Sequence, residues 1–253
     1  MTRARAVLLA RVGVVAGAVL ALELVCRAGL VSPLTLIPPS GMAARLWEML
    51  AEGEVGPDLR YTAGTIVAAV LLSIALGFAL GVAVHALPRL RAALEPLLAA
   101  YYSVPSFVFY PIFVAVFGLN VIPLVILGMA FGVPAMMMAT MNGLDRVPRA
   151  LLRTARVHRL GRLRTIHEVV LPSAAPHLFA GVKLAIAYGF IGIIAGEFIL
   201  ASAGLGHAIA RAYEGFDNPS MYALMLLVLL LVFAMNAVLH LWEGRIQARR
   251  GRA

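Results

Sequence analysis

Long apolar runs alternate along this chain with short segments that contain glycine, proline or charged residues. About 20 apolar residues in an α-helix cross the hydrocarbon core of a bilayer, and runs of that length recur here. They are too long and too continuously apolar for the alternating strands of a membrane barrel. The pattern therefore predicts an all-α membrane protein with about six transmembrane helices, near residues 7–30, 61–84, 97–117, 120–141, 177–200 and 221–242.

Two of the segments between these runs have a helical pattern of their own. Ahead of the second run, Ser40 is a candidate N-cap, and Leu46, Met49 and Leu50 then fall on one apolar face. The segment 205–216 shows a similar pattern ahead of the last run. We expect both to form short helices at the outer surface of the membrane.

Composition supports a membrane location. The chain has 253 residues, of which 62% are hydrophobic and 13% charged, whereas a soluble domain averages about 45–50% apolar and about 25% charged residues. The first run, Ala6–Val31, is too long for the core of a signal peptide, so we expect an uncleaved first span. We therefore expect a single transmembrane domain over 1–253, and Cys26, the sole cysteine, excludes an intrachain disulfide.

The positions of the basic residues predict the orientation. The net charge is +9, and in a membrane protein such an excess collects on the cytoplasmic side. If the chain crosses the membrane six times, three arginines fall on one side, Arg45, Arg60 and Arg211. Fifteen fall on the other side: Arg3, Arg5, Arg89, Arg91, Arg146, Arg149, Arg153, Arg156, Arg159, Arg162, Arg164, Arg245, Arg249, Arg250 and Arg252. Both termini are therefore expected in the cytoplasm, and no nucleic-acid partner is needed to explain the charge.

The longest cytoplasmic segment, about 142–176, contains the sequence "VPRALLRTARVHRLGRLRTIHEVVLP". Pro148 suits the first turn of a helix, and the residues from Ala150 to His158 include no glycine or proline. Gly161 allows a break, and Arg162 to Val170 can form a second helical piece before Pro172. One interpretation of its arginines is a topology signal that also contacts anionic lipid.

The same segment resembles the cytoplasmic "EAA" loop of permease subunits of bacterial ABC importers. That pattern has Glu-Ala-Ala, then a glycine, an isoleucine and Leu-Pro at set distances. Counting back from Leu171-Pro172 places Val169 at the isoleucine, Arg159 at the glycine and Arg153-Thr154-Ala155 at Glu-Ala-Ala. The spacing, Ala155 and Leu-Pro agree with the pattern, whereas arginine replaces its Glu and its Gly.

The flanking sequence extends this resemblance over most of the chain. "YYSVPSFVFYPIFVAVFGLN" is similar to the third span of nitrate, sulfonate and taurine importer permeases, with Pro105, Pro111 and Phe117-Gly118 at family-like spacing. The stretch from Leu171-Pro172 through the fifth span is also similar. Its matching positions are Pro176, Gly181, Lys183, Leu184, Glu197, Gly204, Leu205 and Gly206.

The resemblance implies a complete transport system in a bacterial inner membrane. Two permease subunits, here a homodimer, would form the pathway, and two cytoplasmic ATPase subunits would bind ATP and Mg and supply energy. An extracytoplasmic binding protein would deliver the substrate. The fold would be the ABC importer permease fold, with a cytoplasmic coupling helix between spans four and five. The residues implied in ATPase coupling are Pro148, Leu151, Leu152, Arg153, Thr154, Ala155, Arg156, Arg159, Gly161, Leu171 and Pro172.

Proline and acidic residues inside the spans are further candidates for function. Prolines break the helical hydrogen-bond ladder, and such breaks often line a cavity. The candidate pathway or gate residues are Tyr101, Pro105, Phe107, Phe109, Tyr110, Pro111 and Glu197. Aromatic packing around a kinked helix is the alternative for the first six. For Glu197 the alternative is a charge that reaches the outer interface or pairs locally.

Two other charged positions have simpler explanations. Glu23 and Arg27 are spaced for an i, i+4 ion pair. Lys183, the only lysine, could draw an anion inward or extend its ammonium group to the inner surface.

Several enzyme classes are excluded or disfavoured. A P-loop needs a Gly-Lys pair that the sequence lacks, so ATP hydrolysis is expected on a partner and the chain needs no cofactor or metal. Neither G-x-S-x-G nor H-E-x-x-H occurs, which argues against an intramembrane enzyme. A stand-alone secondary carrier stays an alternative. The resemblance implies a small anionic substrate such as a sulfonate, taurine, nitrate or an organic acid, with a pyrimidine or other vitamin precursor as the alternative.

Overall fold

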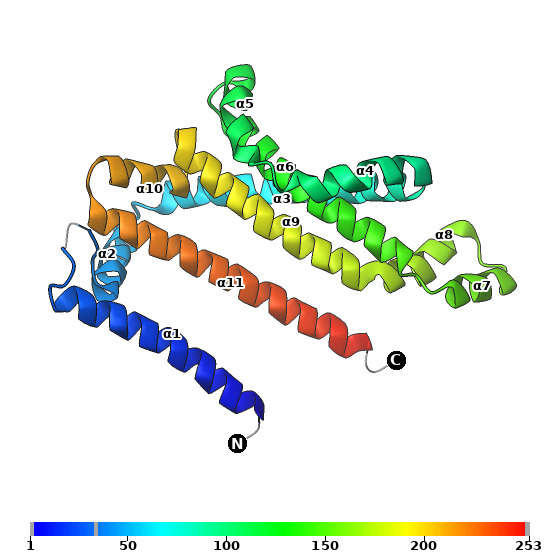
Figure 1. The fold of residues 1–253 in the computed structure, drawn as a ribbon, viewed down its shortest axis with the longest axis horizontal. Helices are drawn as coiled ribbons and strands as arrows, with labels where there is room; N and C mark the ends of the chain where they lie inside the picture. The colour runs from blue at the N-terminus through cyan, green and yellow to red at the C-terminus, as the bar shows by residue number, and fades with distance from the viewer. Residues whose placement is uncertain (1–2, 33–34, 251–253) are drawn as a thin grey trace.

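The computed structural model describes residues 3–32 and 35–250, and Arg252, one of the counted arginines, lies outside them. The regular structure of these described residues is helical, and they contain no strand. In chain order they are α1 (Arg3–Arg27), α2 (Pro39–Ala51), α3 (Gly56–His85), α4 (Pro88–Tyr101), η1 (Ser106–Phe109), α5 (Tyr110–Phe117), α6 (Val121–Asp145), α7 (Arg149–Val157), α8 (Arg162–Thr165), η2 (Ile166–Val170), α9 (Leu171–Leu200), α10 (Leu205–Glu214) and α11 (Asn218–Arg250). Figure 1 shows the long helices α1, α9 and α11 with nearly parallel axes in this view.

Four stretches of the described residues are long and apolar enough to cross a membrane. They are α3, α6, the continuous stretch Arg162–Glu214 that contains α9, and Asn218–Glu243 of α11. A bent pair, Pro88–Tyr101 with Ser106–Phe117, would make a fifth. The first predicted run forms α1, a helix of 25 residues. The membrane location and all-helical class agree with the sequence, while the total of six spans stays a prediction.

The predicted third span, 97–117, is not one straight helix. The chain bends by 92° between Pro88–Tyr101 and Ser106–Phe117. Pro105 precedes the short 3₁₀ segment η1, and Pro111 lies at the start of α5. Because proline has no N–H to donate, each proline ends one run of helical hydrogen bonds and allows the next helix to start in a new direction. The sequence therefore located the breaks correctly but not the start of α4 at Pro88.

The centre of the bundle consists of α3, α6 and α9, which approach closely at glycines. A Cβ atom on Gly77 of α3 would lie 2.7 Å from the Met136 Cβ of α6. A Cβ on Gly192 of α9 would lie 2.8 Å from the Phe131 ring. Lipid tails are as apolar as leucine, so membrane helices associate through such close van der Waals packing at small residues.

We expect Gly181→Ala to destabilise the bundle. The new Cβ on α9 would lie 2.6 Å from the Ala139 Cβ and 2.9 Å from the Met136 sulfur of α6, and overpacking of this kind costs about 1–3 kcal/mol. Gly64→Ala on α3 is the matched control, because a Cβ there meets nothing within 4 Å. Thermal unfolding in detergent should show a lower midpoint for Gly181→Ala only. Equal midpoints would contradict glycine-mediated packing.

At the opposite end from α7, α2 and α10 pack against the start of α11. The buried side chains of this cluster are Leu46, Met49, Val55, Leu205, Ala208, Ile209, Ala223, Leu224 and Leu227. The predicted apolar face of α2 thus includes Leu46 and Met49, whereas Leu50 is 46% exposed. The helical prediction for 205–216 is confirmed by α10.

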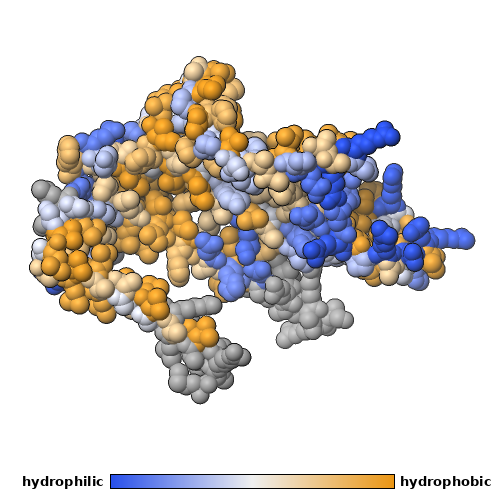
Figure 2. All heavy atoms as spheres, in the orientation of Figure 1, coloured by the Kyte–Doolittle hydropathy of each residue, from blue (hydrophilic) through white to orange (hydrophobic). Residues whose placement is uncertain are grey.

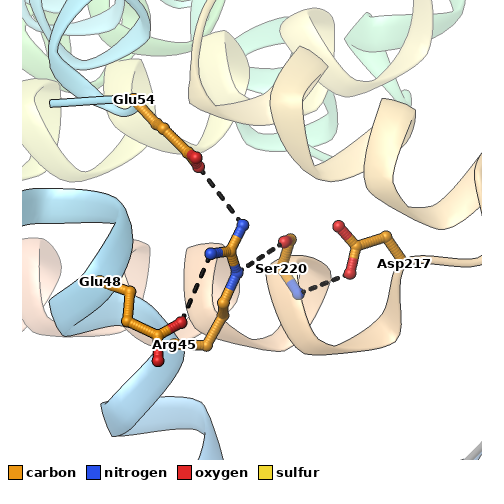
Figure 3. A network of polar contacts seen from close by, with 5 residues as sticks. All are labelled: Arg45, Glu48, Glu54, Asp217 and Ser220. Carbon is orange, nitrogen blue, oxygen red and sulfur yellow. Dashed lines mark hydrogen bonds and ion pairs between the residues drawn. The ribbon is translucent and has the colours of Figure 1, made fainter. Parts of the chain in front are cut away.

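A network of polar contacts lies beside this cluster (Figure 3). Arg45 of α2 donates from Nε to the Ser220 hydroxyl of α11 at 3.1 Å and forms ion pairs with Glu48 and Glu54. The Ser220 amide in turn donates to Asp217 at 3.2 Å. Arg45 therefore ties α2 to the first turn of α11 and to the turn that leads into α3.

Ser40 does not cap α2, contrary to the prediction. Pro38 occupies the N-cap because Pro39 takes the first helical position, which proline favours. The Ser40 amide and hydroxyl instead donate to the Glu23 carboxylate at 3.0 and 2.6 Å. The predicted pair of Glu23 and Arg27 is present at 2.6 Å. Glu23 thus joins α1 to the start of α2.

Candidate functional site

The helix α7 projects beyond the ends of α6 and α9 (Figure 1). Pro148 is its N-cap residue, and the helix ends at Val157. Figure 2 shows hydrophilic residues gathered at this end of the molecule, around α7, α8 and the start of α4. The sequence prediction of a short helix, a break near Gly161 and a second helical piece is confirmed, since Gly161 is the N-cap of α8.

The two sides of α7 differ in chemistry. Ala155 is only 3% exposed and Leu152 is partly buried, whereas Arg153, Thr154 and Arg156 are exposed. Leu151 is 46% exposed on the outward side. Among the loop arginines, the described residues supply an ion pair only to Arg164, which binds Glu168 at 2.7 Å. The arginines of α7 itself are exposed and present their charge outward. The helix therefore offers a basic surface, to which Leu151 adds an apolar side chain.

The backbone at Arg159 explains why the importer pattern has glycine at this position. Arg159 has a φ of +52°, in the left-handed region that glycine adopts most easily. Its amide donates to the Arg156 carbonyl at 3.0 Å, and the Leu160 amide to the Ala155 carbonyl at 2.9 Å. The turn after α7 therefore requires a left-handed residue at the predicted glycine position, even though this chain has arginine there.

The loop continues without interruption into the membrane. The π-helical segment η2 follows α8 directly and leads into Leu171 and Pro172, the first residues of α9. Pro172 lies inside this continuous helical stretch, directly after the wide π turn of η2, and has no N–H to donate there. A displacement of α7 would reach α9 through the turn at 158–161 and then through α8 and η2.

The predicted pathway residue Tyr101 and its neighbour Tyr102 lie at the break that Pro134 makes in α6. Pro134 cannot donate to the carbonyl of Ala130, four residues earlier. The Tyr101 hydroxyl donates to that carbonyl at 2.7 Å, and the Tyr102 hydroxyl donates to the Phe131 carbonyl at 3.5 Å. The Tyr101 hydroxyl at the end of α4 thereby satisfies the carbonyl that Pro134 leaves without its helical donor inside the membrane.

The remaining aromatic residues of the break do not gather in one place. Tyr110 is 1% exposed and packs with Leu124 and Leu127 of α6. Phe107 lines an apolar groove between α9 and α11, and Phe109 is 44% exposed. The exposed Pro105 and Pro111 flank them. Only part of the predicted cluster therefore faces open space, and the gate assignment stays a prediction.

Glu197 is fully buried and belongs to a closed hydrogen-bond network at the C-terminal end of α9. Its carboxylate accepts from the Thr62 hydroxyl at 2.8 Å and from the Gly206 amide at 3.0 Å. Thr62 also accepts from the Leu205 amide at 2.8 Å, and Asp58 accepts from the Gly204 amide at 2.8 Å. These side chains together bind the amides at the N-terminus of α10, which have no partners within their own helix.

This geometry matches the local-pairing alternative for Glu197 and gives it a structural role. Sequence reasoning did not identify Asp58 and Thr62 as its partners. They lie four residues apart on α3, which places both on one face, but nothing in the sequence indicates that this face meets Glu197. The pathway role of Glu197 stays a prediction.

Lys183 has an ion-pair partner. Its ammonium group lies 2.8 Å from the Glu243 carboxylate of α11, so it links the inner halves of α9 and α11. Neither sequence interpretation, attraction of an anion or extension to the surface, anticipated this contact. The described residues contain no group of histidine, cysteine and acidic side chains that could hold a metal ion.

Comparisons with known proteins agree with this architecture. The family described as "binding-protein-dependent transport system inner membrane component" matches residues 73–252. The taurine transport system permease protein of Escherichia coli (strain K12) is 28% identical, over 85% of this chain and 78% of the relative. The nitrate import permease protein of Leptolyngbya laminosa is 26% identical, over 76% and 68% of the two chains.

A solved structure shows the same fold. The chain superposes on the inward-facing MetNI methionine ABC transporter with a TM-score of 0.60 at 19% identity, covering 77% of this chain and 98% of that one. The family match covers most of the chain, including α7, all of α6 and α9, and the last part of α3. The chain therefore belongs to the inner-membrane components of binding-protein-dependent transport systems, the permease subunits of ABC importers.

Proposed function

We propose that this chain forms, as a homodimer, the translocation pathway of an ATP-driven importer for a small organic anion in a bacterial inner membrane. Two cytoplasmic ATPase subunits bind ATP and Mg, and an extracytoplasmic binding protein delivers the substrate. Both termini and α7 lie on the cytoplasmic side. The proposal is supported by the family match and by the excess of arginine on one side of the predicted topology.

The observation that carries the coupling role is the placement of α7. This helix projects from the membrane bundle, presents exposed arginines, and is joined by the turn at 158–161 to α8, η2 and α9. A short helix held in a groove of the ATPase would move with it and transmit that motion to α9. The unpaired arginines favour an acidic rim around this groove.

The substrate class rests on the named relatives. Taurine carries a sulfonate, and nitrate is itself an oxyanion, so both relatives named above transport a solute with negatively charged oxygens. We infer the same class here, with an organic part. A pyrimidine or other vitamin precursor, which would lack this requirement for negative charge, is the competing outcome.

The test is reconstitution of the permease with the ATPase and the binding protein encoded beside it. Vesicles should take up taurine or another small sulfonate only when ATP, the ATPase and the binding protein are all present. Uptake driven by an ion gradient without the ATPase would show a secondary carrier instead. Uptake of a neutral pyrimidine in preference to every anion would contradict the substrate class.

A further inference from the structure

A pocket of about 310 Å³ opens between α6 and α9, beside the end of α4. Three polar side chains line it: Asn142 of α6, and His177 and Tyr188 of α9. Met138, Leu184 and the ring of Tyr102 form apolar parts of its wall. His177 lies about two turns and Tyr188 about five turns into α9, so the pocket extends from the cytoplasmic end of the bundle towards its middle.

The polar groups of this pocket have no partner of their own. Within residues 3–32 and 35–250, no side-chain hydrogen bond or ion pair involves Asn142, His177 or the Tyr188 hydroxyl. Polar groups inside a membrane protein are costly unless they have partners or a function. Tyr102 differs, because its hydroxyl already donates to the Phe131 carbonyl.

The chemistry of the pocket suits an anion rather than a cation. An amide NH₂, an imidazole N–H and a phenol O–H can all donate hydrogen bonds, and no carboxylate lines the pocket. The acidic residue closest in sequence, Asp145, is bound by Arg91 at 2.6 Å. Hydrogen bonds to charged oxygens are stronger than neutral ones, so such donors can replace part of the water that an anion loses.

The walls add a preference for an organic part. The Tyr102 and Tyr188 rings stack with centroids 5.1 Å apart, and Met138 and Leu184 continue the apolar surface. The groove between α9 and α11, nearer the outer end of α9, differs in being lined by apolar side chains throughout. Of these two hollows beside α9, only the pocket between α6 and α9 therefore contains hydrogen-bond donors.

We propose that this pocket is an intramembrane station for a small organic oxyanion, a sulfonate or carboxylate, on its way to the cytoplasm. The proposal rests on the proposed importer function and names the residues that contact the substrate within the permease. Asn142 and His177 donate to the charged oxygens, and the stack of Tyr102 and Tyr188, about three turns farther along α9, covers the organic part together with Met138. At this volume the pocket holds one small solute.

The test measures binding to the permease–ATPase complex in lipid nanodiscs, without the binding protein, by saturation-transfer NMR. Propanesulfonate is the anionic probe and propyltrimethylammonium the cationic one. We expect binding of propanesulfonate only, weakened roughly tenfold by each of Asn142→Leu and His177→Leu, because each removes one hydrogen bond to a charged group. Tyr213→Phe, 63% exposed on α10, is the control that retains binding.

Two outcomes overturn the pocket. One is equal binding of both probes, and the other is unchanged propanesulfonate binding in both variants. ATP-driven uptake in reconstituted vesicles is scored separately. Uptake that persists unchanged in the two variants leaves the importer standing without this pocket. If the wild-type chain shows no ATP-driven uptake but the variants still lose probe binding, the pocket is supported and the importer function is not.

Discussion

Ala155→Asp should abolish coupled transport. Ala155 is 3% exposed on the inner side of α7, so an aspartate there must either be buried or force α7 out of its place. A buried carboxylate without a partner costs about 3 kcal/mol or more. If the observed placement of α7 is needed for coupling, uptake should fall on the order of a hundredfold. The measurement is ATP-driven uptake in vesicles, together with ATP hydrolysis by the same complex.

The controls separate charge, size and assembly. Ala155→Ser adds one polar atom without charge and should retain most of the uptake. Membrane insertion and the amount of permease in the membrane should be unchanged in Ala155→Asp, because α7 lies outside the spanning helices. ATP hydrolysis should continue without transport. Normal uptake in Ala155→Asp would count against α7 as the coupling element.

Much of this fold follows from hydropathy alone. The apolar runs predicted α3, α6, α9 and α11, because a segment that crosses a bilayer must be both long and apolar. The ends were less accurate: α9 begins at Leu171 rather than at 177, since Pro172 is as compatible with the first turn of a helix as with a loop. The break at Gly161 was also predictable from local backbone preferences.

The bend between α4 and α5 illustrates what hydropathy does not contain. The residues on both sides of Pro105 are mostly apolar, so the pattern of side chains predicts one span. The direction in which the chain leaves a proline depends on its tertiary contacts. Here the contact of Tyr101 with the Ala130 carbonyl holds the end of α4 against α6. Such a contact joins residues 29 positions apart, and no local pattern identifies it.

The same limit applied to Glu197. A carboxylate inside a span predicts a functional or paired group, but its partner Thr62 lies 135 residues earlier in the chain. The left-handed conformation of Arg159 was partly foreseeable, because the importer pattern has glycine at that position. Short-range constraints on the backbone could thus be predicted from the sequence. Long-range polar contacts required the packed structure.

Gly204→Ala should be the most destabilising single substitution at the end of the bundle opposite α7. Gly204 has a φ of +104°, a conformation that side chains rarely adopt and that costs of order 1–3 kcal/mol. A Cβ atom there would also collide with the Glu197 carboxylate, which overpacks the site by about 1–3 kcal/mol more. We expect a large loss of thermal stability in detergent, with release of α10 from α3 as its physical cause.

Gly53→Ala separates backbone strain from collision. Gly53 also has a positive φ, +75°, but a Cβ there meets nothing within 4 Å. It should therefore cost only about 1 kcal/mol, the left-handed penalty itself. If Gly204→Ala lowers the unfolding midpoint no more than Gly53→Ala does, the collision with Glu197 is absent in solution.

A double-mutant cycle tests whether the Glu197 carboxylate is the group with which a Cβ atom at position 204 collides. Glu197→Ala alone should destabilise the protein, because the Gly206 amide and the Thr62 hydroxyl lose their shared acceptor. In the Gly204→Ala background the same change also removes the collision. The double variant should therefore be destabilised by less than the sum of the two single variants. Unfolding of the four proteins in one detergent measures this coupling. Strict additivity would mean that Glu197 does not lie over Gly204 and does not hold the first turn of α10 in place.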